Sequence, residues 1–97
     1  MLKKNQKQYL KGLANPLSPT AIIGKDGLTE NILQSIDEYL TAHELIKINV
    51  LKSCETPMQE LVLDIMAATR SELVSQLGRK IVVYRHNSAE PVIRLPK

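Results

Sequence analysis

Three segments of the sequence have apolar residues spaced as on one face of an α-helix. The first runs from Asn5 to Asn15 and the second from Leu28 to about His43. The third begins at Thr56-Pro57-Met58-Gln59, which we interpret as a capping box with proline at the first helical position. Because residues three or four apart lie on the same side of a helix, these patterns predict three amphipathic helices.

Shorter apolar runs between and after the helices predict β-strands. Thr20–Ile23 is rich in β-branched residues, and Leu45–Val50 alternates apolar and polar residues as a half-buried strand does. Leu73–Leu77 and Lys80–Arg85 flank Gly78-Arg79, a pair suited to a two-residue hairpin turn. The last two strands are therefore expected to be antiparallel.

The predicted elements follow the order α-β-α-β-α-β-β along the chain. Helical connections usually join strands that run parallel, so we expect parallel strands one, two and three, and the final hairpin then makes the sheet mixed. The fold class is thus α/β (α+β), one domain over residues 1–97 with a four-stranded mixed sheet. Val92–Leu95 could add a short edge strand, although Pro91 and Pro96 limit it.

Both faces of the predicted sheet are apolar. Ile46 and Ile48 would face one layer of helices, and the opposite face is too apolar to be left in water. We expect the first helix to cover part of it with Tyr9, Leu10 and Leu13. The strand residues expected on this second face are Leu45, Leu51, Val74, Val82 and Tyr84.

The distribution of charge adds a functional hint to this picture. The chain has 97 residues, of which 43% are hydrophobic and 24% charged, as in ordinary globular domains. Its net charge of +3 arises from a basic segment 1–25 with five lysines and no acid, an acidic segment 26–60, and a basic remainder. Two basic ends indicate a polyanionic partner, and the alternative is an ordinary solvated surface of a basic protein.

Several classes of function are disfavoured. The sequence has no apolar run long enough for a membrane span or a signal peptide, so we expect a cytoplasmic protein. Cys54 is the only cysteine, which excludes an internal disulfide and a multi-cysteine zinc site. The absence of P-loop, nucleophile-elbow and metal-ligand patterns indicates neither an enzyme nor a cofactor. With three tyrosines as the only aromatic residues, base stacking of the RRM type is also disfavoured.

The segment Gly24-Lys25-Asp26-Gly27 is the strongest candidate for binding chemistry, because it joins a predicted strand to a predicted helix. Glycine lets a phosphate approach the backbone, the helix start offers free N–H groups, and Lys25 adds a mobile cation. A glycine-rich turn without a ligand is the alternative. Asp26 favours that alternative, because its carboxylate repels phosphate and could instead bond to the helix start.

Taken together, these segments resemble the CRM domain, and specifically its bacterial stand-alone YhbY type. The resemblance is carried by QKQYLKGLANPLSPTAIIGKDGLTE near the N-terminus and by GRKIVVYR near the C-terminus. It implies a fold related to the C-terminal domain of bacterial initiation factor three, with a KH-like GXXG loop used on RNA. It also implies association with precursors of the large ribosomal subunit, whereas plant organellar relatives act in group II intron splicing.

The resemblance assigns RNA-binding roles to specific residues. In the family pattern Asp26 fits less well than a basic or neutral residue would. We therefore expect a monomeric, non-membrane protein that binds ribosomal RNA and assists maturation of the large subunit. The alternative is a protein-binding assembly adaptor whose acidic second helix contacts ribosomal proteins. The assigned residues are Gly24, Lys25 and Gly27 in the loop, Lys3, Lys4, Lys7 and Lys11 in the first helix, and, mainly from charge, Arg79, Lys80 and Arg85 in the hairpin.

Overall fold

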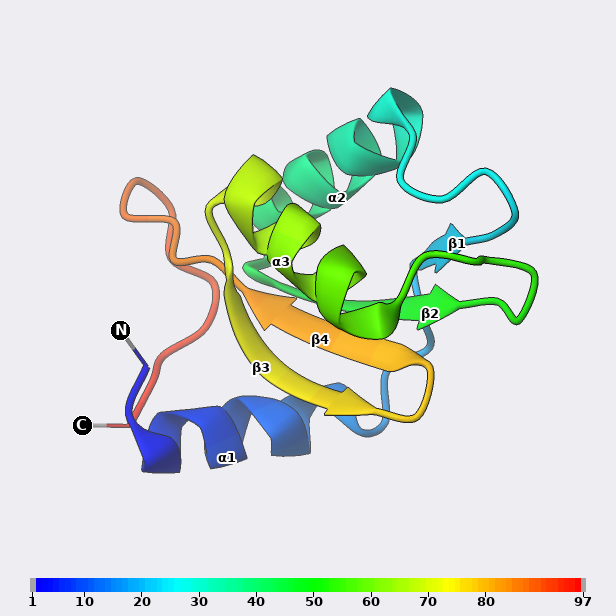
Figure 1. The fold of residues 1–97 in the computed structure, drawn as a ribbon. Helices are drawn as coiled ribbons and strands as arrows, with labels where there is room; N and C mark the ends of the chain where they lie inside the picture. Colours follow the sequence, from blue (N-terminus) through cyan, green and yellow to red (C-terminus); the bar gives the residue numbers. More distant parts are fainter. Residues whose placement is uncertain (1, 97) are drawn as a thin grey trace.

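The computed structural model describes residues 2–96 and places helices on both faces of one β-sheet (Figure 1). The predicted order of elements is confirmed, with element ends that differ from the expected ones by at most two residues. The elements are α1 (Lys4–Ala14), β1 (Ala21–Ile23), α2 (Glu30–His43), β2 (Leu45–Val50), α3 (Met58–Thr69), β3 (Glu72–Leu77) and β4 (Lys80–Tyr84).

The four strands form one mixed sheet in the order β1-β2-β4-β3. β1 pairs with β2 in parallel, and β4 is antiparallel to both of its neighbours. β2 and β3 therefore run in the same direction, as their helical connection predicts, but β4 lies between them. Gly78, with φ of +59°, opens the hairpin turn at the position where type II′ turns place glycine.

The larger hydrophobic core lies between the sheet and the layer of α2 and α3. Ile36 and Leu40 of α2 and Ile65 of α3 are completely buried there. They pack on alternate residues of the sheet, because successive side chains of a strand point to opposite faces. The buried strand residues of this core are Ala21, Ile23, Ile46, Ile48, Val50, Ile81 and Val83.

A second, smaller core lies on the opposite face of the sheet under α1. Leu10 and Ala14 of α1 are buried there, and α1 thus covers this face as expected. The expected contacts of Tyr9 and Leu13 were wrong in part, since these side chains are 43% and 38% exposed. The line of α1 that contacts the sheet runs through Leu10 and, one turn later, the small Ala14. Tyr9 and Leu13 lie at the border of this contact. Leu51 is also exposed, at 42%, because it lies beyond the end of β2.

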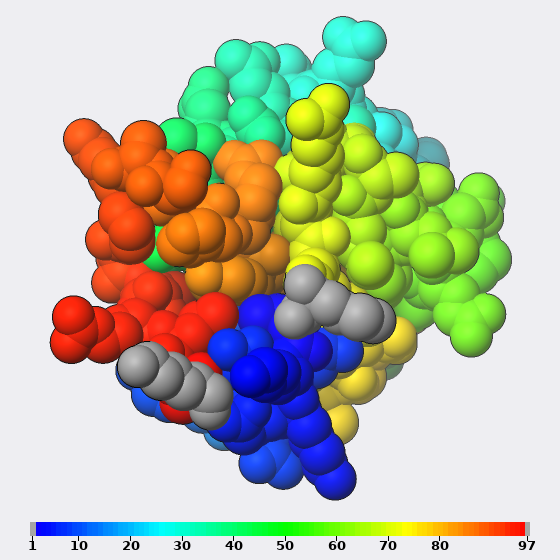
Figure 2. Space-filling view, turned by 90° about the vertical axis from the view of Figure 1, so that its left-hand side faces the viewer, coloured from blue at the N-terminus to red at the C-terminus, as the bar shows by residue number. Residues whose placement is uncertain are grey.

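The segment Val92–Leu95 does not form the short edge strand that the sequence allowed. Ile93 and Leu95 instead pack onto the second core, and the C-terminal residues lie beside α1 in Figure 2. The backbone N–H groups of Val92 and Ile93 donate to the carboxylate of Glu44. Since a side chain binds these N–H groups, they are not available to a strand ladder.

The expected capping box at the start of α3 does not form. Pro57 is the N-cap residue, with an extended ψ of 144°, and no side chain caps the helix. The helix therefore begins at Met58, one residue later than expected. Thr56 then lies outside the N-cap position and its hydroxyl cannot fill the capping role.

Candidate nucleic-acid interface

Gly24-Lys25-Asp26-Gly27 forms a tight reverse turn directly after β1. The N–H of Gly27 donates to the carbonyl of Gly24 at 3.0 Å, and Lys25 and Asp26 are exposed at its tip. Gly27 has φ of +68°, a conformation that a side chain disfavours. A Cβ at Gly24 would only make an ordinary contact, 3.5 Å from Cδ1 of Leu51. The second glycine is thus the one that the turn requires.

The turn is separated from α2 by two residues. Thr29 is the N-cap, and its hydroxyl accepts a hydrogen bond from the N–H of Ile32 at 3.2 Å. The helix therefore begins at Glu30 rather than at Leu28. Because Thr29 caps the helix, Asp26 does not have the capping role considered from sequence, and its charge stays at the tip beside Lys25.

At the turn edge, our name for the end of the strands that holds the Gly24–Gly27 turn, the hairpin turn between β3 and β4 lies beside the end of β2 (Figure 1). Arg79 connects the two: its Nε donates to the carbonyl of Val50 at 2.9 Å, and its Nη2 donates to that of Leu51 at 2.8 Å. Its backbone carbonyl accepts from the N–H of Val50 at 2.8 Å. Arg79, which the sequence assigned to RNA, therefore has an internal role in the structure: its side chain holds the hairpin to the end of β2.

The lysines of the N-terminal segment and of β4 are exposed, and two of them face the same hollow. Lys11 of α1 and Lys80 of β4 line this hollow together with Lys47 of β2. Lys3, Lys4 and Lys7 extend the basic surface along α1 away from it.

Lys47 was not singled out from the sequence, although a lysine within an apolar strand is a signal in itself. Its ammonium donates to the carbonyls of Ala14, Asn15 and Leu17 at 3.2, 3.3 and 3.2 Å. These carbonyls lie at and just after the end of α1, where the helix dipole favours a cation. Lys47 therefore joins α1 to β2.

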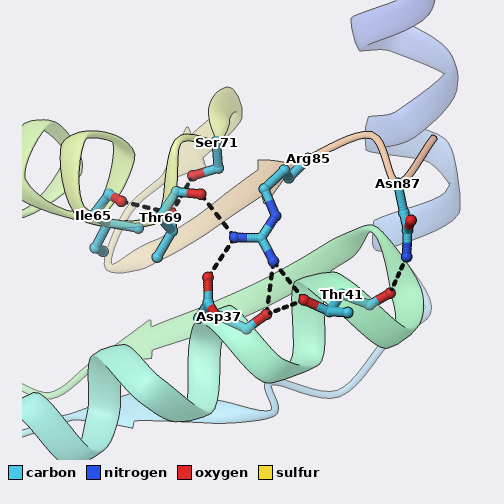
Figure 3. Close-up of polar contacts among 7 residues, drawn as sticks. All are labelled: Asp37, Thr41, Ile65, Thr69, Ser71, Arg85 and Asn87. Carbon is cyan, nitrogen blue, oxygen red and sulfur yellow. Dashed lines mark hydrogen bonds and ion pairs between the residues drawn. The ribbon is translucent and has the colours of Figure 1, made fainter. Parts of the chain in front are cut away.

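Arg85 lies at the other end of β4, away from the turn edge. Its Nη1 donates to the carboxylate of Asp37 and to the carbonyl of Thr69 (2.8 Å), as Figure 3 shows. Its Nη2 donates to the carbonyl of Asp37 and to the hydroxyl of Thr41, both at 2.8 Å. The side chain is 21% exposed. The structure thus gives Arg85 four internal acceptors and does not bring it to the other candidate residues.

Within residues 2–96, no group of three or more His, Cys, Asp or Glu side chains is placed to hold a metal ion. In the same part of the chain, no helix is long and apolar enough to cross a membrane.

Residues 2–85 match the CRS1 / YhbY (CRM) domain family. The chain belongs to this family. The match of the CRM domain includes α1, the Gly24–Gly27 turn and the β3–β4 hairpin, and it ends before the C-terminal segment that packs beside α1.

The CRM-domain chain is also similar to curated proteins over nearly its whole length. It is 36% identical to the Bacillus subtilis protein named "Probable RNA-binding protein YqeI", covering 99% of this chain and 100% of that one. A Haemophilus influenzae protein named "RNA-binding protein" is 40% identical, over 99% of this chain and 96% of the relative. The solution structure of a Staphylococcus aureus protein, 43% identical, superposes with a TM-score of 0.81 over 99% of this chain and 100% of that one.

Proposed function

We propose that this CRM-domain protein binds ribosomal RNA and assists maturation of the large ribosomal subunit, as a monomer in the cytoplasm. One observation carries the proposal: exposed cations from separate segments of the chain lie at the tip of the glycine turn and around a hollow on the α1 side of the sheet. Lys25 lies at the tip of this turn, and Lys11 and Lys80 line the hollow between α1 and the strands β2, β3 and β4. The names of the two curated relatives, both RNA-binding proteins, support the same class of partner.

The electrostatics of the turn edge fit a phosphate backbone. α2 and α3 both begin close after turns at this edge, so the positive ends of their dipoles add to the charge of Lys25, while Glu30 and Glu60 in the first turns of these helices offset part of that effect. Asp26 reduces the local potential, and the basic face of α1 then supplies much of the attraction. The proposed contact residues are Lys3, Lys4, Lys7, Lys11, Gly24, Lys25 and Lys80. Gly27, also assigned to RNA from the sequence, is buried and shapes the turn through its positive φ, while Arg79 and Arg85 support the fold by their internal hydrogen bonds.

A double charge reversal on α1, Lys4→Glu with Lys11→Glu, tests the proposal. Two attractive phosphate contacts become repulsive, so binding to a transcript of large-subunit ribosomal RNA should weaken by about tenfold or more. A plot of log affinity against log salt concentration should become shallower by about 1.4, since each single-strand phosphate contact contributes roughly 0.7.

The matched control is Arg70→Glu with Arg94→Glu, which changes the net charge equally at exposed positions that are not among the proposed contact residues. Its effect on RNA affinity should be much smaller, with melting temperatures recorded for both variants. Equal losses in the two variants, or a wild-type affinity that hardly depends on salt, would instead support a protein-binding adaptor.

A further inference from the structure

Two equivalent reverse turns follow the two parallel strands of the sheet. Ile23 at the end of β1 pairs with Val50 at the end of β2. β1 continues into the Gly24–Gly27 turn, and β2 continues into a turn over Leu51–Cys54, which the N–H of Cys54 closes by donating to the carbonyl of Leu51 at 3.0 Å. The two turns thus begin at the same level of the sheet.

This register gives Lys25 and Lys52 equivalent positions, each the second residue of its turn. Both lysines are exposed, and within residues 2–96 neither has an internal hydrogen bond or ion pair. Neighbouring strands lie about 4.8 Å apart, so turns that continue them start side by side. The pairing extends into the turns, since the N–H of Leu51 donates to the carbonyl of Ile23 at 2.8 Å.

The two turns also lie close together, and the second one is anchored. A Cβ at Gly24 would lie 3.5 Å from Cδ1 of Leu51 and 3.9 Å from the hydroxyl of Ser53, so the bare glycine backbone faces the second turn. Arg79 holds the start of that turn through the carbonyls of Val50 and Leu51. The lysine at its tip is therefore presented from a fixed backbone.

We infer that the Leu51–Cys54 turn is the second half of an RNA-backbone site, in which Lys52 and the hydroxyl of Ser53 contact a phosphate next to the one bound by Lys25. The inference rests on the proposed function, which places RNA at the Gly24–Gly27 turn. Two cations one strand apart suit consecutive phosphates of one RNA strand, because lysine acts as a flexible point charge. Asp26 is adjacent to Lys25, Glu55 follows the second turn, and Glu30 and Glu60 lie in the first turns of α2 and α3. These carboxylates weaken the attraction from the two lysines.

Three single variants that each remove one positive charge test the inference: Lys52→Gln, Lys25→Gln and Arg70→Gln. The probe is a transcript of large-subunit ribosomal RNA, titrated at several salt concentrations. We expect Lys52→Gln and Lys25→Gln each to weaken binding about threefold or more and to lower the salt slope by about 0.7. Arg70→Gln, at the exposed end of α3 away from the turns, should change the affinity less than about 1.5-fold.

The outcomes separate the inference from the proposed function. If Lys25→Gln weakens binding while Lys52→Gln behaves like Arg70→Gln, the first turn binds RNA alone and the inference is wrong. If all three variants bind as tightly as the wild type, the turn edge is not the RNA site, and both the inference and the proposed place of the first turn are overturned. Since both lysines are exposed and unpaired among residues 2–96, the melting temperatures of Lys25→Gln and Lys52→Gln should match that of the wild type.

Discussion

Replacing Glu44 with glutamine should lower the free energy of unfolding by about 3 kcal/mol and the melting temperature by roughly 10–20 °C. Glu44 is completely buried. Its carboxylate accepts hydrogen bonds from the backbone N–H groups of Asn87, Val92 and Ile93 and from Nδ1 of His86. Glutamine keeps one accepting oxygen but turns an NH₂ group toward the other donors. The buried donors that lose their acceptor make the substitution costly.

The same carboxylate predicts how stability depends on pH. Burial acts to raise the pKa of Glu44, but the N–H groups of Ile93, Asn87 and Val92 and the nearby His86 outweigh it and lower the pKa below its ordinary value of 4.5. A carboxyl whose pKa is lower in the folded state stabilises the fold above its ordinary pKa. That contribution is lost as the pH falls below this value and through the lower pKa of the folded state.

Thermal unfolding from about pH 7 to pH 3 in the wild type, Glu44→Gln and Glu38→Gln measures both effects. Glu38 is the matched control, because it is exposed on α2 and accepts a hydrogen bond from Gln34 at 3.1 Å. We expect Glu38→Gln to resemble the wild type and Glu44→Gln to lose less stability on acidification. Parallel curves for the wild type and Glu44→Gln would mean that the buried carboxylate does not contribute as described.

Arg85→Met is expected to lower the free energy of unfolding by about 2 kcal/mol, since methionine keeps an apolar stem but donates no hydrogen bond. Arg85 holds together the end of α3 through the carbonyl of Thr69 and the middle of α2 through Asp37 and Thr41. Its partial exposure keeps the estimate below that for Glu44. At a temperature where the variant is folded, its affinity for ribosomal RNA should equal that of the wild type.

Arg94→Met is a suitable comparison, because Arg94 is exposed in the C-terminal segment. Chemical denaturation gives the stabilities, and titration with the ribosomal RNA transcript gives the affinities. An unchanged stability of Arg85→Met together with a loss of RNA affinity would assign its guanidinium to RNA, as the charge pattern of the sequence suggested.

The helices and strands could be predicted because their signals are local. The period of apolar residues in α2 and the alternation in β2 each need only a few neighbouring residues. The insertion of β4 between β2 and β3 could not be predicted in this way, since strand order depends on contacts between distant segments. The path of the C-terminal segment likewise depends on its hydrogen bonds to the distant Glu44, and no local sequence pattern indicates that Glu44 is buried.

The sequence identifies the basic residues but does not show which groups their side chains contact. Arg79, Arg85 and Lys25 look alike in the sequence, yet the structure supplies internal carbonyl acceptors to the first two. Those acceptors come from segments far along the chain. Lys52 could not be singled out from the sequence, because it lies in the acidic middle segment. Only the parallel register of β1 and β2 brings it beside Lys25.

The bond between Lys47 and the end of α1 bears on how tightly the surface can bind. α1 carries three of the lysines proposed to contact RNA, and the turns lie at the ends of β1 and β2, so an RNA bound to both would span separate elements of the fold. The three carbonyls held by Lys47 fix α1 to β2 before any ligand arrives. The conformational entropy of aligning these parts is thus already lost on folding. RNA would meet a preorganised surface, and less of its binding free energy would be spent on ordering the protein.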